Sequence, residues 1–327
     1  QFSMIRFCTP LREALPFLRS LLLFVAIIVL SGCRHKKQQE ATDTLVSGVI
    51  TIVADENLQN ILEAELDAFS VRFPEAFIFP QYLDERQAID YLVKDSVKLA
   101  IVGRNLDGYE RSLLPKTRVV NCYPFGYEGI AFIINRQNKD SIMSMSQIRD
   151  LLLGRISTWR QINPQSSSDT VKIFFASTQN GIMRYVADSI TRGTKDVSHN
   201  LYSLKEGENI FDKIASNPNN IGIIGINQMG NVNSRQYTQN DGKVRILRVS
   251  KEAGAKLEDT YLPYAGDVYN GDYPFWRPLY VLISETRDGL PRGFCFFLTQ
   301  QVGQKVVQKA GLMPITDVHK IATRWTD

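Results

Sequence analysis

The chain has 327 residues, of which 44% are hydrophobic and 22% are charged, and its formal net charge is +4. This composition excludes a disordered chain, and the length fits two α/β lobes better than one. The basic residues are scattered, and no arginine-rich stripe is interleaved with aromatic residues, so we expect no nucleic-acid partner.

The N-terminal segment 1–32 predicts a signal peptide that is not part of the fold. A basic leader precedes the apolar run 21–30, which would span about 15 Å, half of a bilayer's hydrocarbon core. The sequence Leu30-Ser31-Gly32-Cys33 then resembles the lipobox of bacterial lipoproteins, in which the cysteine is acylated and becomes the first residue. We therefore expect Cys33 to carry a lipid that anchors the protein to a membrane.

Residues 33–47 are polar and lack periodic apolar positions, which predicts a flexible tether between the lipid and a fold that starts near Gly48. Arg34 follows the anchor in place of the aspartate that is associated with inner-membrane retention. The sequence therefore favours a lipoprotein of the outer membrane that faces the periplasm.

From Gly48 onward, strands and helices alternate in a way that is typical of a parallel α/β sheet. The predicted strands are 49–54, 77–82, 99–102, 128–135, 171–176, 220–226, 243–249 and 278–283. The predicted helices are 58–69, a short one through 89–93, one that Ser144 and Gln147 cap and Gly154 ends, 182–190, one around 210–214, and a long one over 291–310.

The segment 171–190 is the centre of the predicted site. It combines a buried strand, a short polar turn and a helix, so the free N–H groups of the helix start point at whatever lies beyond the strand, which suits an anion. In the alternative interpretation, Ser177 or Thr178 caps the helix and nothing binds.

The sequence contains no signature of an enzyme, a cofactor or a metal site. It has no G-x-S-x-G, H-E-x-x-H, Walker or dinucleotide-binding motif, and its three histidines are isolated. We expect neither catalysis nor a cofactor nor a bound metal ion. Cys122 and Cys295 could form a disulfide after export or remain buried thiols, and both alternatives stay open.

Four segments, in order, resemble the phosphate-binding (PstS-like) proteins of bacterial ABC transporters, which have the type 2 periplasmic-binding-protein fold. Residues 152–159 are similar to "L-G-K-I-x-x-W" and 219–224 to "P-x-x-I-G-Y". Residues 273–280 are similar to "Y-P-x-x-R-P-L-Y" and 303–315 to the terminal "G-Q-x-x-x-x-x-x-G-x-x-P". The resemblance covers residues 49–316.

The resemblance implies an α/β fold of two lobes joined by crossing strands, with a ligand cleft between the lobes. Lobe 1 would be discontinuous, with residues 48–126 and 227–327, and lobe 2 would be the insertion 127–226. It also implies a small anionic solute, such as phosphate, and an ABC permease or another envelope protein as a membrane partner.

The sequence departs from the family at the expected phosphate site. The family's turn has the form "R-x-x-x-S-G-T", whereas Ala176, Asn180 and Ile182 stand at the arginine, serine and threonine positions and only Gly181 is retained. Arg104 stands where the family has the carboxylate that accepts the proton of hydrogen phosphate.

Two interpretations of this site stay open. In the first, Ser177, Thr178, Asn180 and Gly181 donate from one lobe and Asn57 and Arg104 from the other. Asp84 also faces the site, and Glu56 or Glu85 meets the cationic part of a zwitterionic solute. In the second, Asp55 and Asp84 cap their own helices, Asp84 in a capping box with Gln87, and the helix ends no longer accept an anion.

The sequence therefore predicts a lipid-anchored solute-binding protein that holds phosphate or another small oxyanion-bearing solute between two lobes. The alternative is a lipoprotein that uses the same scaffold to dock another envelope protein and transports no solute.

Overall fold

The computed structural model describes residues 43–316, apart from 167–168, 178–179, 195–197 and 232. The predicted signal peptide, Cys33 and Thr178 therefore lie outside the described residues. Within the described ranges, no helix combines the length and the apolar character needed to cross a membrane.

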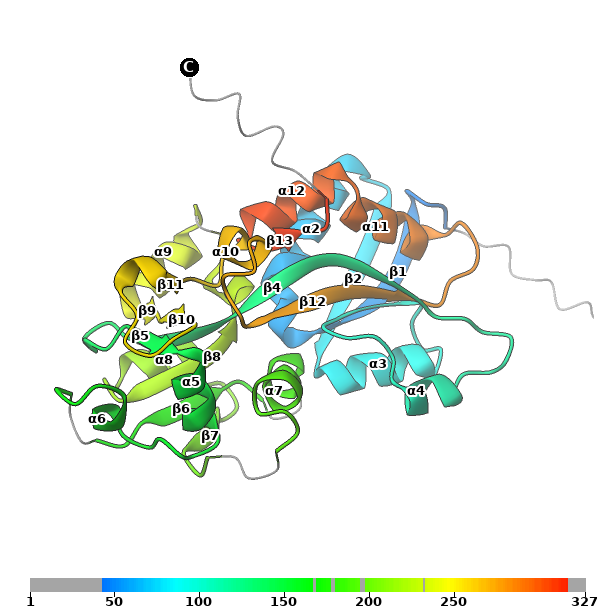
Figure 1. Ribbon diagram of the computed structural model, residues 1–327. Coiled ribbons are helices and arrows are strands. Elements are labelled where there is room, and N and C mark those ends of the chain that lie inside the picture. The colour runs from blue at the N-terminus through cyan, green and yellow to red at the C-terminus, as the bar shows by residue number, and fades with distance from the viewer. Residues whose placement is uncertain (1–42, 167–168, 178–179, 195–197, 232, 317–327) are drawn as a thin grey trace, which may run out of the picture. The chain divides into compact units, whose positions relative to one another are not determined.

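A mixed sheet of ten strands runs through both halves of the fold (Figure 1). Its main path has the order β2-β1-β3-β12-β4-β8-β6-β7, and β13 and β9 also pair with β4. The strands are β1 (Gly48–Asp55), β2 (Ala76–Leu83), β3 (Leu99–Val102), β4 (Asn121–Asn135), β6 (Lys172–Phe175), β7 (Leu201–Ser203), β8 (Asn220–Gly225), β9 (Val244–Ile246), β12 (Trp276–Ile283) and β13 (Met313–Pro314). The predicted strands all occur, although 243–249 is divided into β9 and β10 (Arg248–Ser250).

The long strand β4 joins two lobes. Its residues 121–129 pair with β12, and its residues 130–134 pair with β8. The chain returns beside it, because the amide of Ile130 donates to the carbonyl of Phe275 over 2.7 Å. Figure 1 shows β4 and β12 as the ribbons that connect the β1-β2-α3 side to the β6-β8 side, which we call the first and second lobes.

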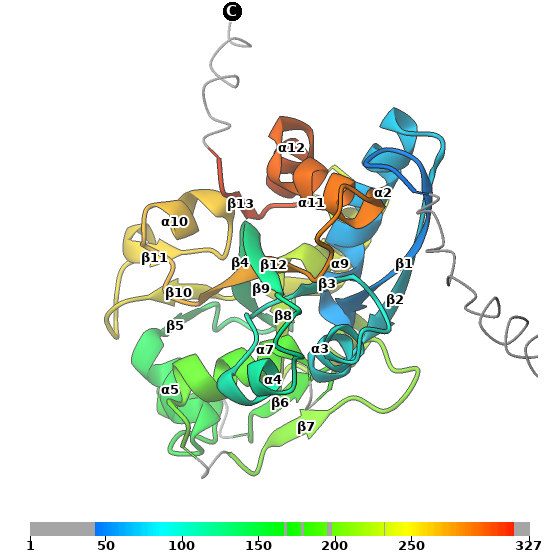
Figure 2. The same cartoon turned by 90° about the vertical axis from the view of Figure 1, so that its right-hand side faces the viewer.

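Helices cover the sheet in both lobes, as the two views show (Figures 1 and 2). In the first lobe they are α2 (Gln59–Arg72), α3 (Glu85–Val93), α4 (Gly108–Ser112), α11 (Leu290–Thr299) and α12 (Gln301–Lys309). The remaining helices are α5 (Met145–Leu152), α6 (Trp159–Ile162), α7 (Gly181–Tyr185) with a π turn over Val186–Ile190, α8 (Ile210–Ala215), α9 (Arg235–Lys243) and α10 (Ala265–Tyr269). A small sheet of β11 (Thr260–Tyr261), β10 and β5 (Ile142–Ser144) packs beside α10 and α5.

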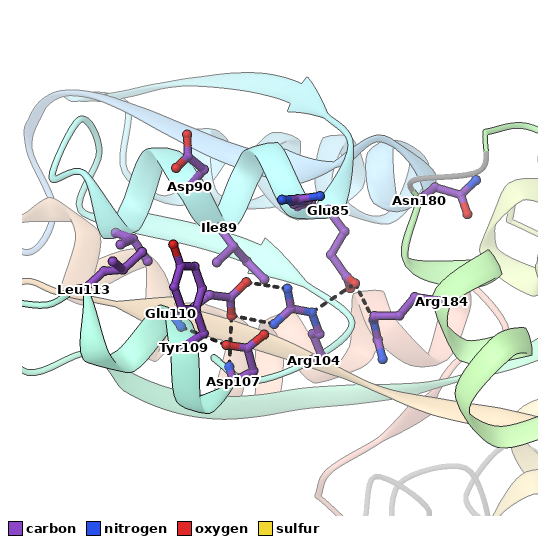
Figure 3. Close-up of a pocket in the computed structure, with 12 residues that line it drawn as sticks. Glu85, Ile89, Asp90, Arg104, Asp107, Tyr109, Glu110, Leu113, Asn180 and Arg184 are labelled. Atoms are coloured by element: carbon purple, nitrogen blue, oxygen red, sulfur yellow. Dashed lines mark hydrogen bonds and ion pairs between the residues drawn. The ribbon is translucent and has the colours of Figure 1, made fainter. Parts of the chain in front are cut away.

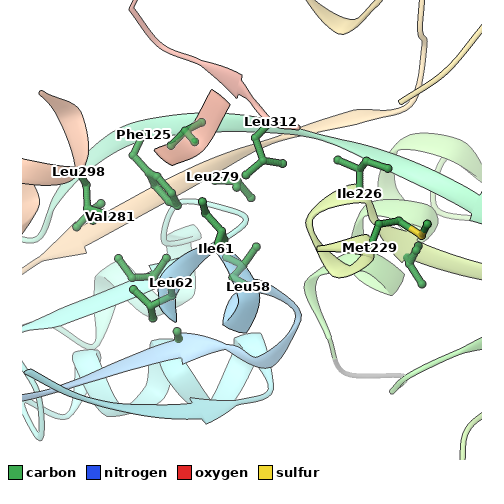
Figure 4. Packing of buried hydrophobic residues seen from close by; sticks show 14 of the residues in the cluster. Leu58, Ile61, Leu62, Phe125, Ile226, Met229, Leu279, Val281, Leu298 and Leu312 are labelled. Atoms are coloured by element: carbon green, nitrogen blue, oxygen red, sulfur yellow. The ribbon is translucent and has the colours of Figure 1, made fainter. Parts of the chain in front are cut away.

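The largest cluster of buried apolar side chains extends through both lobes, because it contains Leu58 of the first lobe as well as Phe174 and Ile214 of the second. Figure 4 shows Leu58 and Leu62 of the segment around α2 against Leu279 and Val281 of β12 in the largest cluster. A second cluster lies within the second lobe and includes the fully buried Trp159. The capping box of Ser144 and Gln147 is present as predicted, and Gly154 follows that helix with a φ of 72°.

Residues 244–275 pack on the second lobe. β9 pairs with the second half of β4 and β10 pairs with β5, which brings Leu247 and Val249 into the second cluster. These residues belong to the stretch 227–327 that the sequence assigns to lobe 1, and the predicted lobe bounds stay a prediction. At the other end of the fold, Asp43 of the predicted tether accepts a hydrogen bond from the amide of Leu290 over 2.7 Å.

The predicted single helix over 291–310 is wrong. Gln300 is extended, with φ −95° and ψ 170°, and separates α11 from α12. The break lets the two helices meet closely, since a Cβ on Gly303 would lie 2.9 Å from the Cα of Leu298. Cys122 and Cys295 are both free thiols in this structure.

Candidate functional site

Charged side chains gather where β1, β2 and β3 end, at the boundary between the lobes. Asp55 ends β1, Asp84 and Glu85 follow β2, and Arg104 lies just after β3. These strands are parallel neighbours, so their carboxyl ends share one edge of the sheet, which is where α/β proteins bind ligands. The start of α7 approaches the same edge from the second lobe.

Arg277 of β12 is the buried centre of this charged cluster. Its side chain is 1% exposed, its Nε donates to Glu128 over 2.9 Å, and its Nη1 lies 3.5 Å from Oδ2 of Asp55. Glu128 also accepts a hydrogen bond from the side chain of Asn227. Because an isolated buried charge is very costly, these partners make the buried guanidinium tolerable.

This environment changes the pKa of the Asp55 carboxyl group. Burial raises the pKa of its carboxyl to about 6, while the charge of Arg277 lowers it and that of Glu85 raises it. The backbone and side-chain amides of Asn57 donate to Oδ1 over 3.2 and 2.8 Å. The prediction that Asp55 caps the helical turn after β1 is confirmed.

Glu85 connects the two lobes (Figure 3). Its Oε1 accepts the amide hydrogen of Gly103 over 2.8 Å. Its Oε2 accepts from Nε of Arg184, in α7, over 2.6 Å and lies 3.5 Å from Nε of Arg104. The carboxylate is only 2% exposed. It therefore forms a buried, charge-assisted contact between the lobes.

Arg104 already forms ion pairs with acidic side chains of its own lobe. Its Nη1 and Nη2 each donate to Glu110 over 2.6 Å, in a two-bond arrangement. Burial alone lowers the pKa of Arg104, and the hydrogen bond and charge of Glu110 outweigh this, so the guanidinium stays charged. An incoming anion would have to compete with these carboxylates.

Gly181 allows the second lobe to approach the cluster closely. A Cβ at this position would lie 2.5 Å from Nη1 of Arg277 and from Oδ2 of Asp55, and 2.6 Å from Oε1 of Glu85. No side chain fits there without moving buried, paired groups. Glycine is therefore required at position 181 because charged side chains lie directly against it. The phosphate-binding family has glycine at the same place in its turn.

We expect Gly181→Ala to lower the free energy of unfolding by about 1–3 kcal/mol, because overpacking a filled site forces its neighbours apart. Gly242→Ala is the matched control, since a Cβ on Gly242, inside α9, meets nothing within 4 Å and alanine favours helices. Urea unfolding of both variants checks this. Equal stability of the two would contradict the close approach at Gly181.

A cavity of about 590 Å³ lies beside Glu85. Figure 3 shows it between α3, the segment that contains α4, and α7, so both lobes line it. Three of the predicted site residues line the cavity, namely Glu85, Arg104 and Asn180. Its other lining groups include the Arg184 guanidinium and the Tyr109 ring.

The remaining predicted site residues lie around the cluster but do not line this cavity. Asn57 is buried against Asp55, and Gly181 packs against the charged groups. Ser177 donates to Asp84 over 3.0 Å, across the lobes. Glu56 is exposed, and partial burial, Asp84 and Asp55 raise its pKa.

Two details of the predicted caps change. Asp84 precedes α3 but makes no side-chain hydrogen bond to it, so the predicted capping box of Asp84 with Gln87 is wrong, because its carboxylate faces Ser177 instead. Asn180 does cap α7, since its side-chain oxygen accepts from the amide of Met183 over 2.9 Å. That oxygen is therefore used within its own turn.

Sequence reasoning missed Arg277, Glu128 and Arg184 as site residues. Arg277 and Glu128 lie within apolar strands that are far apart in the sequence, and a charge inside such a strand was the available signal. Arg184 is four residues after Asn180, which puts it on the same side of the helix start. Across the described ranges, no group of three or more His, Cys, Asp or Glu is placed to hold a metal ion.

The structure is an α/β fold of two lobes with a charged cluster at the boundary between them. A family model described as a PBP superfamily domain matches residues 39–301. The chain belongs to this family.

Relatives and solved structures agree with that assignment. The chain is 21% identical over 183 residues to the phosphate-binding protein PstS of Staphylococcus saprophyticus, a match that covers 54% of this chain and only 51%, about half, of that protein. It is 20% identical over 281 residues to PstS of Bacillus subtilis, covering 83% of this chain and 82% of the relative.

Two solved structures share the fold at low identity. One, from Clostridium perfringens, is described as a phosphate ABC transporter substrate-binding protein with bound phosphate, and has a TM-score of 0.67 at 19% identity, covering 82% of this chain and all (100%) of that one. An ABC-type phosphate transport receptor from Vibrio cholerae has a TM-score of 0.60 at 18% identity, again covering 82% and 100%.

Proposed function

We propose that this protein is a lipid-anchored, periplasm-facing receptor that binds a small oxyanion-bearing solute between its lobes and presents it to a membrane transporter. The observation that carries the proposal is the cavity of about 590 Å³ that Arg104 lines from the first lobe and Arg184 from the second. Guanidinium groups are the side chains best suited to planar recognition of oxyanions.

The comparisons support solute binding over the docking of another envelope protein. A relative that matches 83% of the chain is a phosphate-binding protein, and periplasmic binding proteins close two lobes on a ligand by hinge motion. The lipid anchor rests on the lipobox-like sequence that ends at Cys33. Phosphate itself is one candidate solute, and the acidic groups beside the arginines favour a solute that also carries a positive charge.

We expect calorimetry with phosphate, sulfate and a panel of zwitterionic phosphate esters to detect a solute, and Arg184→Ala to weaken its binding about ten- to a hundredfold. That range corresponds to the loss of one charge-assisted hydrogen bond, about 1.5–3 kcal/mol. Thermal unfolding of the variant separates lost affinity from lost stability.

Arg155→Ala is the matched control, because Arg155 belongs to the second lobe but is 67% exposed and forms a 3.0 Å ion pair with Asp150. It should bind the solute as the wild type does. If no solute of the panel changes the heat or the melting temperature, the proposed function is wrong.

A further inference from the structure

The Glu85 carboxylate has the partners that a bound oxyanion would have. It accepts a backbone N–H from Gly103 and a guanidinium hydrogen from Arg184, and it lies 3.5 Å from a nitrogen of Arg104. These donors come from both lobes. In Figure 3 the Glu85 side chain points from the start of α3 to the place where the two guanidinium groups converge.

The space at this point is filled while Glu85 is in place. The Cα of Gly181 faces Oε1 of Glu85 so closely that a Cβ there would lie 2.6 Å from it. A Cβ on Gly103 would lie 3.0 Å from the same oxygen. A second anion cannot use the same donors unless the Glu85 side chain moves away.

The charges of the cluster also oppose a simple anion. Four carboxylates, those of Asp55, Glu85, Glu110 and Glu128, face three guanidinium groups, those of Arg104, Arg184 and Arg277. The cluster therefore has no surplus positive charge to attract a dianion. An added negative group next to Glu85 would be repelled.

We propose that Glu85 determines the specificity of the site by acting as a built-in anion that holds the lobes together and that only a zwitterionic solute can displace. This inference rests on the proposed function. A solute that takes Arg104 and Arg184 leaves Glu85 without its cations, and a buried carboxylate without a partner is strongly disfavoured. A solute that brings its own ammonium group restores that partner, whereas inorganic phosphate does not.

The test compares inorganic phosphate with phosphoethanolamine, which adds an ammonium group to a phosphate ester. Calorimetry should show that the wild type prefers phosphoethanolamine at least tenfold. In Glu85→Ala the affinity for inorganic phosphate should rise at least tenfold and the preference should vanish. Equal phosphate affinity in the wild type and Glu85→Ala overturns the role of Glu85.

Small-angle X-ray scattering without any solute tests the contact between the lobes independently of binding. Glu85→Ala and Arg184→Met, which cut the contact from opposite sides, should both increase the radius of gyration. Glu110→Gln is the matched control, because Glu110 pairs with Arg104 within the first lobe and bridges no lobes. An unchanged radius in both Glu85→Ala and Arg184→Met overturns the inference.

The two sets of measurements keep this inference distinct from the proposed function. If the wild type and all variants bind nothing, the receptor function and the specificity role both fail, and the scattering result alone decides whether Glu85 holds the lobes. Glu85→Gln, which keeps the shape of the side chain, replaces Glu85→Ala if the latter does not fold by circular dichroism. It should gain phosphate affinity because it removes the charge.

Discussion

Replacing Arg277 with methionine is expected to lower the free energy of unfolding by about 3–5 kcal/mol. The arginine is buried against Glu128 and Asp55, and removing one partner of a buried ion pair leaves an uncompensated charge in a medium that solvates it poorly. Urea unfolding at neutral pH, with the variant and wild type compared by their midpoints and slopes, measures the loss.

Two further variants distinguish a lost ion pair from lost packing. In Arg277→Met/Glu128→Gln the orphaned carboxylate is removed, so the double variant should be more stable than Arg277→Met alone. Arg287→Met is the control for an exposed arginine, since Arg287 is 43% exposed in its pair with Asp43, and such pairs contribute about 0–1 kcal/mol. A loss below about 1 kcal/mol in Arg277→Met would contradict the buried cluster.

The pH dependence of the same variant follows from Asp55. Burial raises its pKa from 3.8 to about 6, so the folded state gains from protonation, and this stabilisation is lost as the pH rises from about 3.8 through 6. Arg277 lowers that pKa, and its removal extends the loss to higher pH. Arg277→Met should therefore be less destabilising at pH 5 than at pH 8.

Local patterns were sufficient to predict most of the fold. The alternation of apolar strands and amphipathic helices placed β1 to β3, β6 and β8, and the cap formed by Ser144 and Gln147 fixed the start of α5. The break at Gln300 was not predictable in this way, because the apolar periodicity continues across it and only the close packing of α11 on α12 requires it.

The site was only partly predictable, for a different reason. Glu85 and Arg104 stand in polar loops directly after strands, so their place at the sheet edge follows from the chain order. Their ion-pair partners, Arg184 for Glu85 and Glu110 for Arg104, come from the other lobe and from the short helix α4. These pairs depend on the three-dimensional arrangement and not on the local sequence. Arg277 and Glu128 are paired through strand register, which no local pattern reveals.

Replacing Glu65 with methionine is expected to raise the free energy of unfolding by about 2–3 kcal/mol at pH 7. Glu65 shares the buried face of α2 with Ile61, Leu62 and Phe69 and is 0% exposed. Both of its carboxyl oxygens lack a hydrogen-bond partner among the residues that the structure describes. Methionine fills a similar volume without a polar group to desolvate.

The pH dependence of the free energy of unfolding distinguishes the loss of a buried carboxyl group from a change in packing alone. Burial raises the pKa of Glu65 from 4.5 to about 9, so the wild type loses stability as the pH rises between these values, by up to about 1.4 kcal/mol per pH unit. The Asp55 contribution ends near pH 6, so urea unfolding between about pH 6.5 and 8.5 isolates Glu65. Wild type and the exposed control Asp67→Asn should both lose stability over this range, whereas the stability of Glu65→Met should be nearly constant. A parallel decline in Glu65→Met would show that another group causes the loss and would contradict the raised pKa of Glu65.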